Sequence, residues 1–64
     1  MNINIPDNAT NGDVIKALFP NWEYKDSAVK IGYDYNHYID CYVTKTWVVS
    51  FDKYWWNAPY KEKG

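Results

Sequence analysis

The chain has 64 residues and a formal net charge of −1, with seven Lys, eight Asp or Glu, and no Arg. A chain this short forms one small domain and buries only about 60% of its unfolded surface. Its single Cys excludes an internal disulfide, and the lack of Arg disfavours duplex DNA reading, because Arg is best suited to bidentate recognition of phosphate and guanine. Stability must therefore come from self-association or from aromatic bulk, since Trp, Tyr and Phe make up 20% of the residues.

The first residues do not resemble a signal peptide. Residues 1–5 contain no basic segment and no long apolar run. No stretch of the sequence approaches the roughly 20 apolar residues that span a bilayer. We therefore expect a cytosolic protein that does not bind membranes, which fits a free Cys41. Because Asn and Ile alternate over residues 1–5, an added edge strand and a loose arm both remain open.

The segment TNGDVIKALFP predicts a helix from about Asn11 to Phe19. Thr10 is a good N-cap, and Asp13, three residues later, completes a capping box and complements the helix dipole. Pro20 ends the helix. The apolar side chains share one face, which must dock on the rest of the fold because so short a helix is marginal alone. These side chains are Val14, Ile15, Leu18 and Phe19.

After the helix, the apolar period changes from about 3.6 to 2, which predicts short β-strands. Alternation over residues 22–25 and 29–34 gives two strands. The polar run at residues 25–27 between them predicts a tight connection. Residues 33–37 predict a loop or turn, because Asp and Asn tolerate bent backbone.

The next part of the chain predicts two further strands. Residues 39–43 alternate apolar and polar side chains, and residues 47–51 form the last strand. Thr44-Lys45-Thr46 lacks the usual turn residues Gly, Asn and Pro. A turn is nevertheless expected there, because one strand across the whole stretch would be unusually long.

The end of the chain predicts a capped helical turn. Asp52 is placed to cap a turn that runs through Trp56, and Pro59 ends it. We therefore expect one α+β domain over residues 1–64. One short N-terminal helix packs on a three- to four-stranded antiparallel meander, with a short C-terminal helical turn. Only the last residues, KEKG, are expected to fray.

His37 and Cys41 are the side chains with potential for catalysis or metal binding. His37 is near Asp34 and Asp40 in the sequence, and a His beside carboxylates can act as a general base or a metal ligand. A base needs a nucleophile or a second acid, and a metal needs at least three ligands. Cys41 falls on the predicted core face, where a free Cys is usually an inert hydrophobe. We therefore predict no catalytic, cofactor-binding or metal-binding residue, and a protein that is not an enzyme.

The sheet face opposite the predicted core is expected to carry Tyr38 and Tyr42, together with Lys30 and Val48. Such a face can stack single-stranded bases or anchor a protein partner, unless the C-terminal segment folds back and covers it. The charge disfavours nucleic acid, because contacts with a phosphate backbone need a positive groove.

Trp55 and Trp56 are adjacent, so on a helical turn their side chains point about 100° apart and cannot both face one core. One is expected to anchor the C-terminal segment to the sheet. The other is the best single contact residue. With Tyr38, Tyr42 and Tyr60 they form the predicted partner-binding set.

Two segments, TNGDVIKALFP near the start and FDKYWWNAPYK near the end, together resemble a group of small phage and prophage proteins of Gram-positive bacteria. They cover about a third of the chain. The resemblance implies an accessory phage protein that acts inside the bacterial cell. Small phage proteins of this kind often bind and block a host or defence protein, as anti-CRISPR proteins do. No catalytic residue is carried over, because the group has no assigned mechanism.

The sequence therefore favours a non-enzymatic, phage-encoded protein-binding module that inhibits a bacterial host or defence protein. One alternative is a single-stranded nucleic-acid binder that uses the tyrosine-bearing face with Lys30, Lys45 and Lys53. A further alternative is a homo-oligomer in which the same aromatic surface closes on itself.

Overall fold

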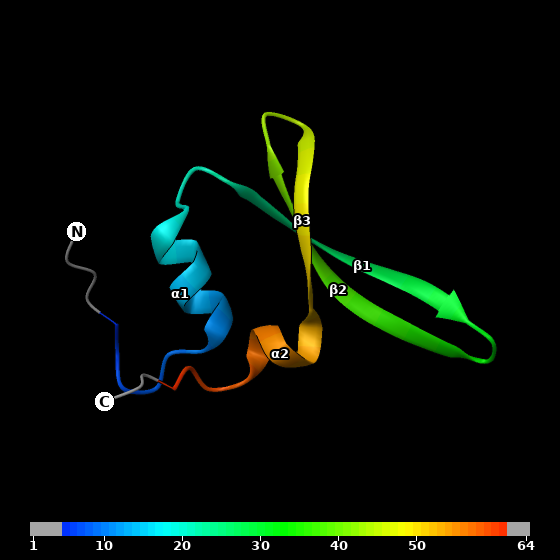
Figure 1. Cartoon of the computed structure of the whole chain (residues 1–64), viewed down its shortest axis with the longest axis horizontal. Helices are drawn as coiled ribbons and strands as arrows, with labels where there is room; N and C mark the ends of the chain where they lie inside the picture. The colour runs from blue at the N-terminus through cyan, green and yellow to red at the C-terminus, as the bar shows by residue number, and fades with distance from the viewer. Residues whose placement is uncertain (1–4, 62–64) are drawn as a thin grey trace.

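The elements of the chain form a three-stranded sheet with two short helices. The computed structural model describes residues 5–61. Along the chain lie α1 (Asn11–Leu18), β1 (Glu23–Ile31), β2 (Asp34–Val43), β3 (Thr46–Asp52) and α2 (Lys53–Asn57). The strands pair antiparallel in the order β1-β2-β3. Figure 1 shows both helices beside one part of the sheet, while the β1–β2 hairpin projects away from them. The predicted α+β meander is confirmed.

The predicted start of α1 is confirmed by its capping hydrogen bonds. The Thr10 hydroxyl accepts from the Asp13 N–H at 3.1 Å, and the Thr10 N–H donates to the Asp13 carboxylate at 2.9 Å. That backbone donor is the main reason why the pKa of Asp13 lies below its usual value. The helix ends at Leu18, and the N–H of Phe19 donates to the carbonyl of Ile15.

The core forms where α2 and α1 meet one face of the sheet. Trp56 from α2 is 6% exposed and packs with Ile39 and Cys41 of β2, which are also buried. Half-buried side chains surround this cluster: Ile15, Trp22, Tyr24, Val49 and Phe51. We call the sheet face that carries Ile39 and Cys41 the covered face, and the opposite one the open face.

Gly12 allows α1 to approach the core closely. A Cβ atom at this position would overlap the Trp56 indole, so only Gly fits where the two helices meet. The apolar face of α1 is only partly used. Ile15 packs on the core cluster, whereas Leu18 and Phe19, which were expected to dock, are exposed.

Hydrogen bonds join the two ends of the described chain. The Asn11 N–H donates to the Ala58 carbonyl at 2.9 Å, and the Asn11 side-chain amide donates to the Trp55 carbonyl at 2.8 Å. The Tyr60 N–H donates to the Ala9 carbonyl at 2.9 Å. The C-terminal segment is therefore fastened to the start of α1. The edge strand or loose arm predicted at residues 1–5 lies outside the described residues, except for Ile5, which belongs to no strand. The fraying predicted for KEKG also lies outside them, except for Lys61.

The connection predicted at residues 25–27 is wrong, because β1 runs through it without a break. Lys25 pairs with Asp40, and Ser27 pairs with Tyr38. A polar run can remain in a strand when its side chains meet solvent, and Lys25 is exposed with its ammonium over the Tyr42 ring.

The loop predicted at residues 33–37 is also wrong. The hairpin turns at Gly32 and Tyr33 alone, and Ile31 pairs directly with Asp34. Gly32 has a φ of +63°, as expected for the first central residue of a two-residue type II′ turn. Asn36 and His37 therefore belong to β2.

The turn predicted between β2 and β3 is confirmed, and it lies at Thr44 and Lys45. Both residues adopt positive φ, at 49° and 67°. This conformation suits the type I′ turn of a tight hairpin but favours Asn or Gly, and it is unusual for a β-branched Thr. The turn therefore carries local strain.

We expect Gly12→Ala to lower the free energy of unfolding, measured by urea denaturation. In an ordinary helix this change adds about 1 kcal/mol of stability. Here the new methyl group overlaps a buried indole, and overpacking of this kind costs about 1–3 kcal/mol. In a Trp56→Phe background the smaller ring leaves room, so the same change should cost less. An equal loss in both backgrounds would contradict the proposed contact.

We expect Thr44→Asn combined with Lys45→Gly to raise the thermal midpoint, with a gain of about 1 kcal/mol in unfolding free energy. The two replacements relieve the left-handed strain without touching the core. The control is Thr46→Asn, where the backbone is extended in β3. It should bring no gain, because Asn is a poor strand residue.

Candidate functional site

The β1–β2 hairpin extends well past β3 and leaves an uncovered arm. The pairing of β3 with β2 begins at Tyr38, so among residues 5–61 the parts of β1 and β2 beyond it pair only with each other. Every residue of the described chain from Ala28 to His37 is exposed. We call residues 28–37 the hairpin arm, which lies to the right in Figure 1. An isolated two-stranded hairpin is only marginally stable in water, which makes this bare arm a candidate contact segment.

Four large apolar side chains are exposed on the hairpin arm. Val29 and Ile31 are 50% and 57% exposed, and Tyr35 is 57% exposed. Tyr33, at the turn, is 100% exposed. Single exposed apolar residues are normal on a protein surface, whereas a concentration of them in one segment is typical of an interaction site.

The arm presents different side chains on its two faces. Directly paired residues share a face, so Lys30 lies beside Tyr35, while Val29 lies beside Asn36. The face that carries Lys30 and Tyr35 continues the covered face beyond the helices. The face that carries Val29 continues the open face.

Tyr38 and Tyr42 lie on the open face, as expected. Tyr42 is paired with Glu23 on one side and Trp47 on the other. The Lys25 ammonium lies 5.1 Å from the centre of the Tyr42 ring, a cation–π arrangement. Both tyrosines are half-buried among their neighbours in the sheet.

A bulge in β3 adds Trp47 to the open face, which the sequence analysis did not foresee. The register shifts after Cys41, so Cys41 pairs with Val49 and Tyr42 pairs with Trp47, leaving Val48 without a cross-strand partner. Val48 is 41% exposed. The shift brings two aromatic rings together on one face.

Two hydrogen bonds hold Trp47 in place on the open face. Its indole N–H donates to the Ser50 hydroxyl at 2.9 Å, and that hydroxyl donates to the Asp40 carboxylate at 2.6 Å. Trp47 remains 57% exposed. The structure therefore offers a fixed aromatic side chain next to Tyr42, well suited to contact a partner.

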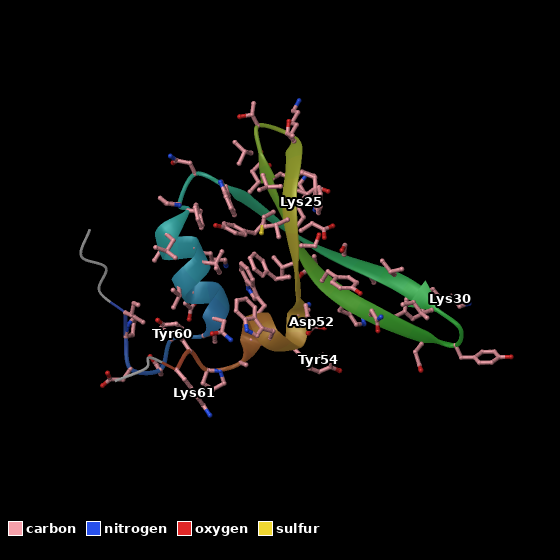
Figure 2. All side chains as sticks on the ribbon, in the orientation of Figure 1. Lys25, Lys30, Asp52, Tyr54, Tyr60 and Lys61 are labelled. Carbon is pink, nitrogen blue, oxygen red and sulfur yellow. The ribbon has the colours of Figure 1, made fainter. Side chains whose placement is uncertain are left out.

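The lysines expected to support nucleic-acid binding are not brought together. Lys30 lies on the face opposite Tyr38 and Tyr42, because the two-residue turn of the arm pairs it with Tyr35. Lys45 is in the β2–β3 turn, and Lys53, on α2, lies 3.4 Å from the Asp26 carboxylate. Figure 2 shows Lys30 near the end of the arm and Lys25 on the body of the sheet. The placement predicted for Lys30 is therefore wrong.

The adjacent tryptophans divide their roles as expected. Trp56 is buried in the core, whereas Trp55 is 44% exposed. One face of the Trp55 ring stacks on Phe51 with centroids 5.2 Å apart. Because Phe51 lies on the covered face opposite Ile39, Trp55 and the tyrosine pair occupy opposite sides of the sheet.

Tyr60 is separated from the rest of the predicted partner-binding set. Its N–H bonds to Ala9, so the C-terminal segment lies against the start of α1, as Figure 2 also shows. As far as Lys61, where the described chain ends, the segment does not cover the open face. The predicted set Tyr38, Tyr42, Trp55, Trp56 and Tyr60 is thus spread over the open face, α2, the core and the C-terminal segment.

His37 lies apart from the carboxylates that are near it in the sequence. It pairs with Ala28, on the face opposite Asp34 and Asp40. It lines a shallow hollow of about 300 Å³ at the base of the arm, with Lys53, Tyr54 and Asn57 from α2. Within residues 5–61, no three His, Cys, Asp or Glu side chains gather as a metal site requires.

Cys41 is fully buried. Burial raises the pKa of its thiol, and the nearby charge of Asp40 raises it further. A nucleophilic Cys needs the opposite conditions, namely exposure and a lowered pKa. The structure therefore gives Cys41 a packing role.

Comparisons with models of protein families, with curated proteins and with solved structures found no match to this chain. In the part of the chain that the structure describes, neither helix has the length and apolar character needed to cross a membrane. The functional proposal therefore rests on the surfaces described above.

The hairpin arm itself was missed by the sequence analysis, although the sequence carries a signal for it. Gly32 and Tyr33 separate two alternating runs by two residues, which is the spacing of a tight hairpin. Reading that turn first pairs Ile31 with Asp34 and extends both strands. The bulge that exposes Trp47 has no comparable sequence signal.

We expect the thiol of Cys41 to react slowly with iodoacetamide in the native protein at pH 8. The raised pKa reduces the thiolate fraction, and burial blocks access of the reagent. Reaction should become fast in guanidinium. The matched control is Tyr54→Cys, which places a second thiol at an 84% exposed position and should be labelled rapidly in the native state. Equal native rates at both positions would refute the packing role.

Proposed function

We propose that this chain is a non-enzymatic protein-binding module that attaches to a bacterial protein through the hairpin arm. The observation that carries the proposal is the exposure of Val29, Ile31, Tyr33 and Tyr35 on a two-stranded arm that nothing covers within the described residues. Burial of such side chains on binding is favourable by about 25 cal/mol per Å² of apolar surface.

The arm suits protein recognition in its chemistry. It carries one Lys and one Asp, so its charges balance, and its aromatic residues are tyrosines. Tyrosine offers a large apolar ring and a polar hydroxyl group, and it is common at the centres of protein interfaces. A phosphate backbone would instead require a concentration of positive charge.

The open face enlarges this proposed surface. Val29 of the arm shares its face with Tyr38, Tyr42 and Trp47. A partner that lies along this face can contact the arm and the fixed Trp47 ring together.

The biological setting that we propose follows from the resemblance to phage and prophage proteins. The two segments that carry it, around Gly12 and Trp56, contact each other in the structure and form part of the core. The arm lies between them in the sequence and outside that core. We propose that the module is an accessory protein acting in the bacterial cytoplasm, where it blocks a host or defence protein.

Affinity capture from a lysate of a Gram-positive host tests this function. We expect the tagged wild-type chain to retain a bacterial protein that Tyr33→Ala/Tyr35→Ala loses, because half of the large apolar contacts of the arm are removed. The control is Tyr54→Ala, which removes an 84% exposed tyrosine ring from α2. Circular dichroism confirms that all three proteins fold.

Capture that is unchanged by the arm variant would reject the arm as the binding site. A Trp47→Ala variant then asks whether the open face binds alone. Binding of labelled single-stranded DNA or RNA at low salt, lost in the arm variant, would favour the nucleic-acid alternative instead.

A further inference from the structure

We propose that the outer edge of β1 pairs antiparallel with β1 of a second copy, joining two sheets into one of six strands. The proposal goes beyond the proposed function, because it uses the backbone edge of β1, which includes the β1 part of the hairpin arm, and leaves the arm's tyrosines outside the new strand pairing. Within the described residues, β1 is an edge strand with β2 on its only paired side. Its free backbone N–H and C=O groups are a ready template for another strand.

The charge pattern of β1 selects one register for this pairing. A two-fold axis at Ala28 places Asp26 of each copy opposite Lys30 of the other. Two opposite-charge pairs then form across the interface. Asp26 and Lys30 lie on the same face of β1, so they can meet in this way.

Neighbouring registers lose this complementarity. A two-fold axis at Asp26 places the Asp26 carboxylates of the two copies directly opposite each other. An axis at Ser27 places Asp26 opposite Ala28, and an axis at Val29 places Asp26 opposite Gly32. Of these registers, only the one with its axis at Ala28 gives both Asp26 and Lys30 a partner of opposite charge.

The remaining side chains fit the same register. Ala28 meets its own copy at the axis, where a small side chain avoids a clash. On the other face, Val29 lies opposite Ser27, and Lys25 lies opposite Ile31 of the second copy. The 57% exposed Ile31 can therefore be covered by the aliphatic part of Lys25.

The second free edge of the sheet, along β3, is a poorer candidate. The bulge that leaves Val48 unpaired interrupts the regular geometry that strand addition needs. In addition, the only charged side chain of β3 is Asp52, which already caps α2 by accepting from the N–H groups of Tyr54 and Trp55. Self-pairing along β3 therefore lacks complementary charges.

Sedimentation equilibrium over a concentration series tests the dimer. We expect the wild-type chain to associate and Lys30→Asp to weaken association roughly tenfold, because each new carboxylate faces Asp26 of the other copy. The double variant Asp26→Lys/Lys30→Asp should restore association, because the charges are exchanged. It also breaks the contact of Asp26 with Lys53, but a pair so exposed adds little stability.

The matched control is Lys45→Asp, the same charge change in the β2–β3 turn, which should associate like the wild type. A wild-type chain that remains monomeric overturns the proposal. The outer edge of β1 would then be available only to a strand of a different protein. Failure of the double variant to recover, while circular dichroism shows it folded, overturns the register.

Oxidative cross-linking tests the register independently. Directly opposed residues of antiparallel strands have Cα atoms about 4.5–5.5 Å apart, which suits a disulfide. We expect Ala28→Cys to form a covalent dimer, whereas Val29→Cys and the wild type, whose Cys41 is buried, should not. Cross-linking of Val29→Cys in place of Ala28→Cys would overturn the register. Because the arm tyrosines are unchanged in every variant, loss of the dimer is distinguishable from loss of partner capture.

Discussion

The contact between Trp56 and Gly12 is the interaction on which the rest of this fold depends. It lets α2 insert a large ring between α1 and the covered face, which a chain of this size needs because it has little else to bury. The bonds from Asn11 to α2 and its following residue then fasten the ends together. With the core completed at one part of the sheet, the hairpin beyond β3 is left without a packing role.

This division separates the stabilising core from the surface that we propose for recognition. Side chains that face the core are Ile39, Cys41 and Trp56, and none of them lies on the hairpin arm. Substitutions on the arm therefore alter the contact surface while leaving the stabilising cluster intact. The open face is intermediate, since Tyr42 and Trp47 help to order the sheet and also remain available for contact.

The sequence predicted what depends on local chemistry and missed what depends on pairing. The capping box at Thr10, the cap at Asp52 and the separation of Trp55 from Trp56 all follow from neighbouring residues, and the structure has each of them. The arm was missed because the polar residues of β1 resembled a turn. In an exposed hairpin, burial does not mark one face, so only the turn at Gly32 sets the register. The same register pairs Lys30 with Tyr35, and this places Lys30 on the face opposite to the one predicted.

The two-residue turn at the end of the hairpin arm makes its length adjustable. Because side chains alternate with a period of two, inserting two residues into each strand keeps every inner side chain on its face, whereas inserting one exchanges the faces beyond the insertion. Within the described residues, the strand pairing of Ala28 to His37 is confined to the arm, so insertions near its turn disturb the pairing of no other strand. The fold therefore provides an exposed hairpin whose reach can change in steps of two residues per strand while the core remains as it is.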